Sequence, residues 1–273
     1  ISITPGFRYD RIVTESDGYF HAVVNDSLYY INDFKKLERG IFLAGLGASY
    51  KCFVGGEVYA NFSQNYRAIN FNDMQVINSN VVIDPNLEDE KGFNLDIGLR
   101  GIAWGVLEYD LSTFYLNYSN RIGYLLSYYN ESTAPTSDLV WKSYQLSTNI
   151  GDSKTLGIES YVSWNVFKSF TEIETQALNI FLNTSFQRGT YVRSDEPSIV
   201  GNRIEYNPDM NLKFGLQYQY KSITNSLLYS YTSNQFADAQ NTVSPSQNAL
   251  FGEIPAYSVV DWSVKYENEG FFI

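Results

Sequence analysis

The sequence is poor in the residues that build metal centres and covalent active sites. Its 273 residues include one cysteine, one histidine and two methionines. The lone Cys52 excludes disulfide bonds within the chain, and we interpret it as a plain residue at a strand end. His21 has no second histidine or cysteine with which to hold a metal ion, and no evident nucleophile to activate. We therefore expect no enzyme activity, no catalytic or metal-binding residue and no cofactor.

Long apolar runs and clusters of basic residues are also missing. No stretch reaches about 18 consecutive apolar residues, so the sequence contains no candidate membrane-spanning helix. The formal net charge is −11, and without a lysine and arginine cluster the chain cannot replace the counterions of a nucleic acid. Acidic residues are densest at residues 84–90, which we interpret as a solvated loop, with a Ca²⁺ site as the alternative.

Aromatic residues and strict alternation are what the sequence does have. Tyrosine occurs 23 times and phenylalanine 18 times, a composition that favours strands over helical bundles. In residues 57–73, Val58, Ala60 and Phe62 fall on one side of an extended chain. The other side is polar and carries Tyr59, Asn61, Ser63, Asn65 and Arg67. A soluble sandwich would bury the apolar side, whereas a membrane barrel would turn it to lipid and the polar side to a wet lumen.

The same alternation recurs along the chain and predicts about eleven strands, of which about ten are complete. Long polar connections, at about residues 10–40, 70–91 and 121–140, alternate with short turns such as 53–56 and 101–105. Outer-membrane barrels join their strands in this way, with long external loops and short periplasmic turns. The predicted fold class is therefore all-β, a transmembrane antiparallel β-barrel, with a soluble β sandwich or propeller as the alternative.

One predicted strand, residues 106–121, is difficult to phase. Its apolar residues change from odd to even positions along the strand, from Leu107, Tyr109 and Leu111 to Phe114, Leu116 and Tyr118. We interpret the change as a bulge or as an aromatic lining of the lumen near the outer rim.

The chain also has the features of one part of a larger barrel. Single-chain bacterial barrels have an even number of strands, whereas here a first strand starts at Ile1 and a further one begins at Phe271. An open sheet in lipid would leave costly unpaired backbone groups at its edges. We therefore expect residues 1–273 to form one contiguous part of a longer barrel.

Motifs spread over the whole chain are more specific when their order and spacing are taken together. They are TPGFRYD (4–10), ANFSQNYRAINFND (60–73), DEKGFNLDIGLRG (89–101), FYLNYSNRIG (114–123), TNIGDSKTLGIES (148–160), FADAQNT (236–242) and GEIPAYSVVDWSVKY (252–266). This series resembles the C-terminal part of the barrel of TonB-dependent outer-membrane receptors, and within that family the ferric dicitrate receptor branch.

The resemblance implies a barrel of about 22 strands closed by an N-terminal plug, in the bacterial outer membrane. The implied function is import of a ferric chelate, ferric citrate or a related siderophore, with energy from the TonB complex. The plug, the first barrel half and the closing strand have no counterpart in these residues, so contact with TonB would belong to the missing plug region. The expected partners are the chelate, TonB and outer-membrane lipid. Alternatives are a non-transporting structural or docking barrel of an envelope complex, TonB-dependent uptake of a non-iron nutrient, and a soluble carbohydrate-binding sandwich.

The predicted substrate-binding residues follow from the chemistry of such a chelate. Ferric citrate is anionic and rich in carboxylate oxygens, which the planar fork of arginine binds well. Arg67 is the best candidate, because it lies on the polar side at the outer end of its strand, where Asn65 shares that side. Arg121 and Gln235 are expected at similar heights on other strands. The alternative for each is a hydrogen-bond network in the lumen or packing against the plug.

Overall fold

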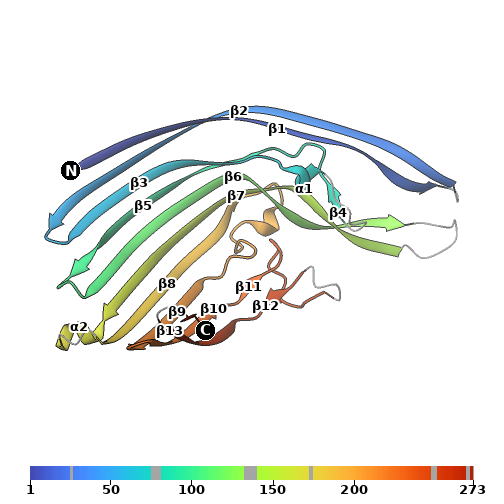
Figure 1. Cartoon of the computed structure of the whole chain (residues 1–273). Coiled ribbons are helices and arrows are strands. Elements are labelled where there is room, and N and C mark those ends of the chain that lie inside the picture. The colour runs from blue at the N-terminus through green and yellow to red at the C-terminus, as the bar shows by residue number, and fades with distance from the viewer. Residues whose placement is uncertain are drawn as a thin grey trace.

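The protein is represented by a computed structural model that describes residues 1–24, 27–74, 81–131, 140–171, 175–246, 251–268 and 271–272. One curved sheet dominates it (Figure 1). Eleven strands follow one another across this sheet in chain order, each antiparallel to the next, and β4 lies off this path, parallel to β7. The strands on the path are β1 (Ser2–Val24), β2 (Ser27–Phe53), β3 (Gly56–Arg67), β5 (Glu90–Ala103), β6 (Leu107–Glu131), β7 (Val140–Asn165), β8 (Gln176–Arg193), β9 (Met210–Tyr220), β10 (Ile223–Thr232), β13 (Tyr257–Asn268) and β14 (Phe271–Phe272).

The remaining elements are short and lie in the connections. Strand β4 (Val81–Ile83) and helix α1 (Phe71–Met74) lie between β3 and β5, and helix α2 (Val166–Phe170) follows β7. A 3-10 helix, η1 (Pro197–Ile199), follows β8, and β11 (Gln235–Phe236) pairs with β12 (Glu253–Ile254). Among the described residues, no helix has the length and apolar character needed to cross a membrane. The prediction of an all-β antiparallel fold with about eleven strands is confirmed.

The two faces of the sheet differ in polarity. Residues that are paired in register lie on the same face, so the apolar face is continuous from strand to strand. Val58 on β3 lies opposite Leu99 on β5, which lies opposite Leu111 on β6. We call this apolar side the outer face and the polar side, where Asn61 lies opposite Asp96, the inner face. Large side chains of the outer face stay exposed, among them Ile3, Phe7, Leu46, Phe62, Leu95, Ile158, Phe186, Phe214, Leu227 and Val260.

A continuous exposed apolar face has no place in a soluble sandwich, whose two sheets cover each other. In the described part of the chain, the second sheet is the short β11–β12 pair, too small to cover the main sheet. Phe214 accordingly remains 38% exposed. The sandwich alternative is therefore wrong, and the outer face has the polarity of a surface against lipid.

Short turns join strands at one end of the sheet, which we call the turn end. Val54 and Gly55 connect β2 to β3, residues 104–106 connect β5 to β6, and residues 221–222 connect β9 to β10. Gly55 has φ +82°, and a Cβ there would lie 2.6 Å from the carbonyl oxygen of Ile102, so only glycine fits this turn. These turns confirm the predicted short connections.

The opposite end, which we call the loop end, corrects two predicted boundaries. Residues 10–40 and 121–131 were expected to be polar connections, but residues 10–24, 27–40 and 121–131 are strand. β1 and β2 remain paired up to Val24 and Ser27, and β6 and β7 remain paired up to Glu131 and Val140. The backbone ladder holds these extensions together, so they need no apolar side and lack the alternation that identifies a half-buried strand. The side chain of His21, in the β1 extension, lies outside the described residues.

The register also fixes the phase of β6. Pairing with β5 and β7 runs without a shift from Leu107 to Tyr118, so Phe114 and Leu116 lie on the inner face. The bulge occurs later, at Tyr118 to Ile122, where Asn120 takes a left-handed φ of 56°. Phe114 therefore lines the inner face, as one alternative predicted, but it lies in the first half of β6 and not near the outer rim, and the change of phase is not caused by a bulge.

The buried core is small and lies at the loop end. It consists of Ile150, Tyr191, Ile199, Ile204 and Ala239, which come from β7, β8, η1 and the connections that follow β8 and β11. Ile199 and Ala239 are fully buried, at 0% exposure. The core thus packs the loops against the end of the sheet. At the other end, Cys52 is exposed next to the last residue of β2, as expected.

Candidate functional site

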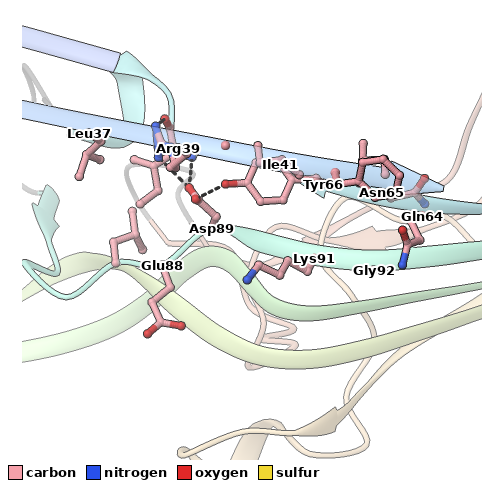
Figure 2. Close-up of a pocket in the computed structure, with 15 residues that line it drawn as sticks. Leu37, Arg39, Ile41, Gln64, Asn65, Tyr66, Glu88, Asp89, Lys91 and Gly92 are labelled. Atoms are coloured by element: carbon pink, nitrogen blue, oxygen red, sulfur yellow. Dashed lines mark hydrogen bonds and ion pairs between the residues drawn. The ribbon is translucent and has the colours of Figure 1, made fainter. Parts of the chain in front are cut away.

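A cavity of about 730 Å³ lies at the loop end, where β2 separates from β3 (Figure 2). Pairing between these strands stops at Gly45 and Ser63, although β3 stays paired with β5 up to Arg67. The side chain of Gln64 bridges the beginning of the gap, because its Oε1 accepts a hydrogen bond from the Ala44 amide at 2.9 Å. Residues of β2, β3 and β5 line the cavity, together with residues of the loop before β5.

Arg39 and Asp89 form the ion pair at the wall of this cavity. An Arg39 Nη1 to Asp89 Oδ1 distance of 2.8 Å joins them, and their side chains are 13% and 14% exposed. Arg39 also donates to Thr14 Oγ1 at 2.7 Å and to the carbonyl of Ile69 at 3.1 Å. Asp89 accepts further hydrogen bonds from the Ile69 amide and from the Tyr66 hydroxyl. This cluster ties the β3–β5 loop to the β1–β2 hairpin.

Arg67 lies at the end of β3 and is held by two carboxylates. Its Nη1 lies 3.0 Å from Glu90 Oε1 and its Nη2 lies 2.9 Å from Asp73 Oδ1. Glu90 is 5% exposed and also accepts a hydrogen bond from the Ile122 amide at 3.0 Å. Asn65, two residues before Arg67 on the inner face, lines the 730 Å³ cavity and an inner-face cavity of about 550 Å³.

Arg121 lies on the wall of a separate cavity of about 340 Å³. Its Nε lies 3.8 Å from Glu205 Oε1, and the two side chains are 24% and 10% exposed. Glu205 Oε2 accepts a hydrogen bond of 2.5 Å from the Tyr191 hydroxyl. The Arg121 Nε is buried and makes no hydrogen bond within the described chain. Gly123 provides room for this group, because a Cβ there would lie 2.9 Å from Glu205 Oε1.

The structure brings three of the four predicted residues together. Asn65 and Arg67 share β3, and Glu90 links Arg67 to the amide of Ile122, the residue after Arg121. Gln235 lies in a different element, β11, and no hydrogen bond among the described residues joins its side chain to the other three. Its hairpin is connected to the Arg121 group through the backbone, since the Tyr206 amide donates to the Phe236 carbonyl at 2.8 Å. Each arginine has carboxylate neighbours, as the alternative of an internal hydrogen-bond network required.

The sequence pattern did not predict four of the residues that form these groups, Arg39, Glu90, Glu205 and Tyr191. Arg39 was assigned to a connection, although its odd number matches Leu43, Gly45 and Gly47 on the inner face of β2. Continuing that parity beyond Gly40 would have found it. Glu205 could not be found from its neighbours in the sequence. It lies in a loop, and only the folded chain brings it to Arg121.

The acidic residues 84–90 are not simply solvated, which corrects that interpretation. Asp89 and Glu90 are largely buried and hydrogen-bonded, as described above. Asp84 accepts a hydrogen bond from the Thr148 hydroxyl at 2.6 Å, and this bond holds the pKa of Asp84 below its ordinary value. Across the described ranges, no group of three or more His, Cys, Asp or Glu residues is placed to hold a metal ion. Protein donors satisfy these carboxylates.

Towards the turn end, the inner face carries a row of polar pairs. Asn61 Nδ2 donates to Asp96 Oδ2 at 2.7 Å, and the Tyr59 hydroxyl donates to Asp110 Oδ1 at 2.8 Å. The cavity of about 550 Å³ is lined by Asn61, Asp96 and Tyr59, together with Phe114. The prediction of a polar inner face is confirmed, and its hydrogen-bonding groups have the character of a wet lumen.

Comparison with known proteins gives the family context for this arrangement. Residues 1–270 match the family model described as TonB dependent receptor-like, beta-barrel. The unliganded ferric citrate transporter FecA matches with a TM-score of 0.65 and 19% identity, over 97% of this chain and 35% of that protein. The ferric yersiniabactin uptake receptor FyuA from Yersinia pestis matches with a TM-score of 0.65 and 16% identity, over 97% and 35% of the two chains.

A third match has a different cargo in its description. The copper transporter OprC matches with a TM-score of 0.65 and 15% identity, over 97% of this chain and 37% of that protein. The chain thus spans about a third of the length of these structures. Likeness at this level of identity supports the fold, and the family model covers nearly every residue. The chain therefore belongs to the TonB-dependent receptor family, whose β-barrel it matches from residue 1 to residue 270.

Proposed function

We propose that residues 1–273 form part of the barrel wall of an outer-membrane receptor that imports a ferric chelate, ferric citrate or a related siderophore. The family is one of bacterial outer-membrane transport receptors, which are not enzymes. The exposed apolar outer face supports placement of this chain in that membrane. In this proposal, the remaining barrel strands and a plug belong to the longer protein, and TonB acts through the plug region.

The observation that carries the substrate class is the pair of arginines at the loop end. Arg67 and Arg121 lie on neighbouring parts of one hydrogen-bonded group, with Glu90 between them. A ferric chelate presents several carboxylate oxygens around one metal ion, so it can engage two guanidinium groups together. Asn65 and Gln235 would supply the additional amide contacts at this end of the lumen.

The two arginines would bind such a ligand differently. The Arg121 Nε has no hydrogen-bond partner in the described residues but is buried, so a ligand carboxylate would meet the Arg121 side chain where that side chain lines the cavity of about 340 Å³. Arg67 is already bound on both sides, and a ligand there must displace Asp73 or Glu90. Each of these carboxylates is also held by a backbone amide, Asp73 by that of Asn70 at 2.9 Å and Glu90 by that of Ile122 at 3.0 Å. Chelate binding at Arg67 would therefore have to replace a carboxylate that other groups also hold.

Uptake of a non-iron metal is the second candidate. OprC, a copper transporter, matches with the same TM-score as FecA, so likeness of fold does not separate these cargoes. A copper site would use nitrogen or sulfur ligands. The inner-face groups named above are instead guanidinium, amide and carboxylate, which fit an anionic chelate better than a bare copper ion.

The test is equilibrium binding of ferric citrate to the purified full-length protein. We expect Arg67→Ala and Arg121→Ala each to weaken binding about tenfold or more, because each removes a charge-assisted hydrogen bond. Arg188→Ala is the matched control. Arg188 pairs with Asp209 on the outer face and is 59% exposed, so its loss should leave the affinity unchanged.

Three outcomes would separate the alternatives. Unchanged affinity in both lumen variants would remove Arg67 and Arg121 from the site. Binding of copper without binding of any ferric chelate would support the second candidate. If the full-length protein binds neither chelate nor TonB, a structural or docking barrel is the better explanation.

A further inference from the structure

A further cavity, of about 540 Å³, lies on the outer face at the turn end. Its floor is the last pair of residues between β6 and β7, Leu107 and Trp164, which face each other across the two strands. Both belong to the outer face, since the same row continues through Val162 and Ile158. Val106 and Trp104 of the β5–β6 turn form one wall. The cavity is therefore apolar and opens on the side that faces lipid in the proposed function.

One aromatic side of this cavity, Trp164, is fixed in position. Trp164 Nε1 donates to Ser169 Oγ at 2.8 Å, so its indole is held to α2. The ring of Phe170 lies 6.3 Å from that of Trp164, in an edge-to-face arrangement. Trp104 is 87% exposed at a turn position with φ 52°. Indoles that combine an apolar body with one polar group are enriched at the boundary between membrane and water.

Lys168 places a positive charge at the rim of the cavity. It lies in α2, where Asn165 caps the helix by accepting a hydrogen bond from the Lys168 amide at 3.0 Å. Its ammonium is exposed and makes no ion pair within the residues that the structure describes. Lys221, in the β9–β10 turn, differs from Lys168 in having an aromatic partner. Its ammonium lies 5.3 Å from the ring centre of Tyr220.

We infer that this cavity binds one phospholipid of the turn-side leaflet, with an acyl chain against Leu107 and Trp164 and the phosphate on Lys168. The inference rests on the proposed placement in the outer membrane. The cavity is apolar, carries at its polar rim a cation without an ion-pair partner among the described residues, and opens along the outer face. Those three features together fit an amphipathic ligand with an anionic head group. Free phosphate would leave the apolar walls exposed, and a hydrocarbon would leave the ammonium unused.

Native mass spectrometry of the full-length protein in detergent, titrated with phosphatidylglycerol, tests the inference. Lys168→Gln should weaken binding of the first lipid about fivefold, the effect of one basic residue near an anionic lipid surface. Trp104→Ala should weaken it as well, through loss of apolar contact. Lys221→Gln is the matched control, because Lys221 lies in another turn at the same end, and it should bind lipid as the wild type does.

The outcomes distinguish this site from the proposed function. Inorganic phosphate in excess should not displace the lipid, and displacement would show a phosphate site without a lipid site. Equal lipid binding by the wild type and both cavity variants would overturn the inference while leaving chelate import untouched. Protein that stays monodisperse without detergent would overturn the membrane placement, and with it both proposals. Chelate affinity should be the same in Lys168→Gln as in the wild type.

Discussion

Arg39 at the loop end and Arg100 at the turn end each hold a carboxylate at hydrogen-bond distance, but their settings differ. Arg39 and Asp89 are 13% and 14% exposed, whereas Arg100 and Glu57 are 53% and 23% exposed. Arg100 and Glu57 face each other directly in the register of β3 and β5. No ladder pairs Arg39 with Asp89 among the described strands, and the two side chains meet across the gap where β2 leaves β3.

This difference shows which forces hold each end of the sheet. At the turn end, backbone pairing already places Arg100 beside Glu57, so their contact adds little to the architecture. At the loop end, the backbone ladder between β2 and β3 has stopped, and side chains replace it. Asp89 alone accepts hydrogen bonds from Arg39, Tyr66 and the Ile69 amide. The loop end should therefore be more sensitive to single substitutions than the turn end.

Asp89→Asn is expected to have the largest effect. The substitution keeps the shape but leaves the Arg39 guanidinium without its counter-charge in a mostly buried place. Breaking a buried pair in this way costs about 3 kcal/mol, which should raise local opening of the loop about 100-fold. Hydrogen exchange followed by mass spectrometry in the peptide that contains Ile69 measures this opening.

The control for Asp89→Asn is exchange in a peptide of β9, which lies away from the loop and should keep the wild-type rate. Equal acceleration in both peptides would mean that the substitution unfolds the whole sheet. An unchanged rate at Ile69 would show that Asp89 does not tie the loop to β1 and β2.

Gly123→Ala should have an intermediate effect at the loop end. The new Cβ would lie 2.3 Å from Ile150 Cδ1 and 2.9 Å from Glu205 Oε1. Overpacking of this kind costs about 1–3 kcal/mol of stability. Because the nearest atom is the end of the Ile150 side chain, which can move aside, we expect a cost in the lower half of that range. Thermal unfolding measures the loss of stability, and ferric citrate binding reports whether the shift of Glu205 reaches Arg121.

Gly6→Ala is the matched control for that substitution. Gly6 lies in β1, and a Cβ there would meet only the Gly45 carbonyl oxygen, at 4.0 Å. We expect its melting temperature to equal that of the wild type. If the two alanine variants lose the same stability, the effect belongs to strand glycines in general and not to the packing around Glu205.

The contrast between the two ends also explains what the sequence predicted well. Val58, Ala60 and Phe62 alternate with polar residues because one side of β3 faces outward and the other faces the lumen. Such a period of two is visible in a single sequence, and it predicted the fold, the polar inner face and the short turns. Arg67 and Asn65 were placed correctly on the inner face for the same reason.

The loop end was harder to predict because its contacts join residues that are distant in the chain. The β1 and β2 extensions are held by backbone pairing and carry no alternating pattern, so they were mistaken for a connection. Glu205 reaches Arg121 only after β8 and its loop have folded back onto β6. The separation of β2 from β3 beyond Gly45, which creates the cavity, leaves no mark in either strand.

Glu57→Gln should have the smallest effect and provides the sharpest comparison with Asp89→Asn. Arg100 keeps a second partner, because its guanidinium lies 4.9 Å from the ring centre of Tyr59. The Arg100–Glu57 pair is open to solvent, so salt screens it. We expect no resolvable change in the melting temperature at physiological salt, and at most a slight decrease at low salt. If Glu57→Gln lowered the stability by as much as is expected for Asp89→Asn, charge pairing, and not the backbone ladder, would hold β3 to β5 at the turn end.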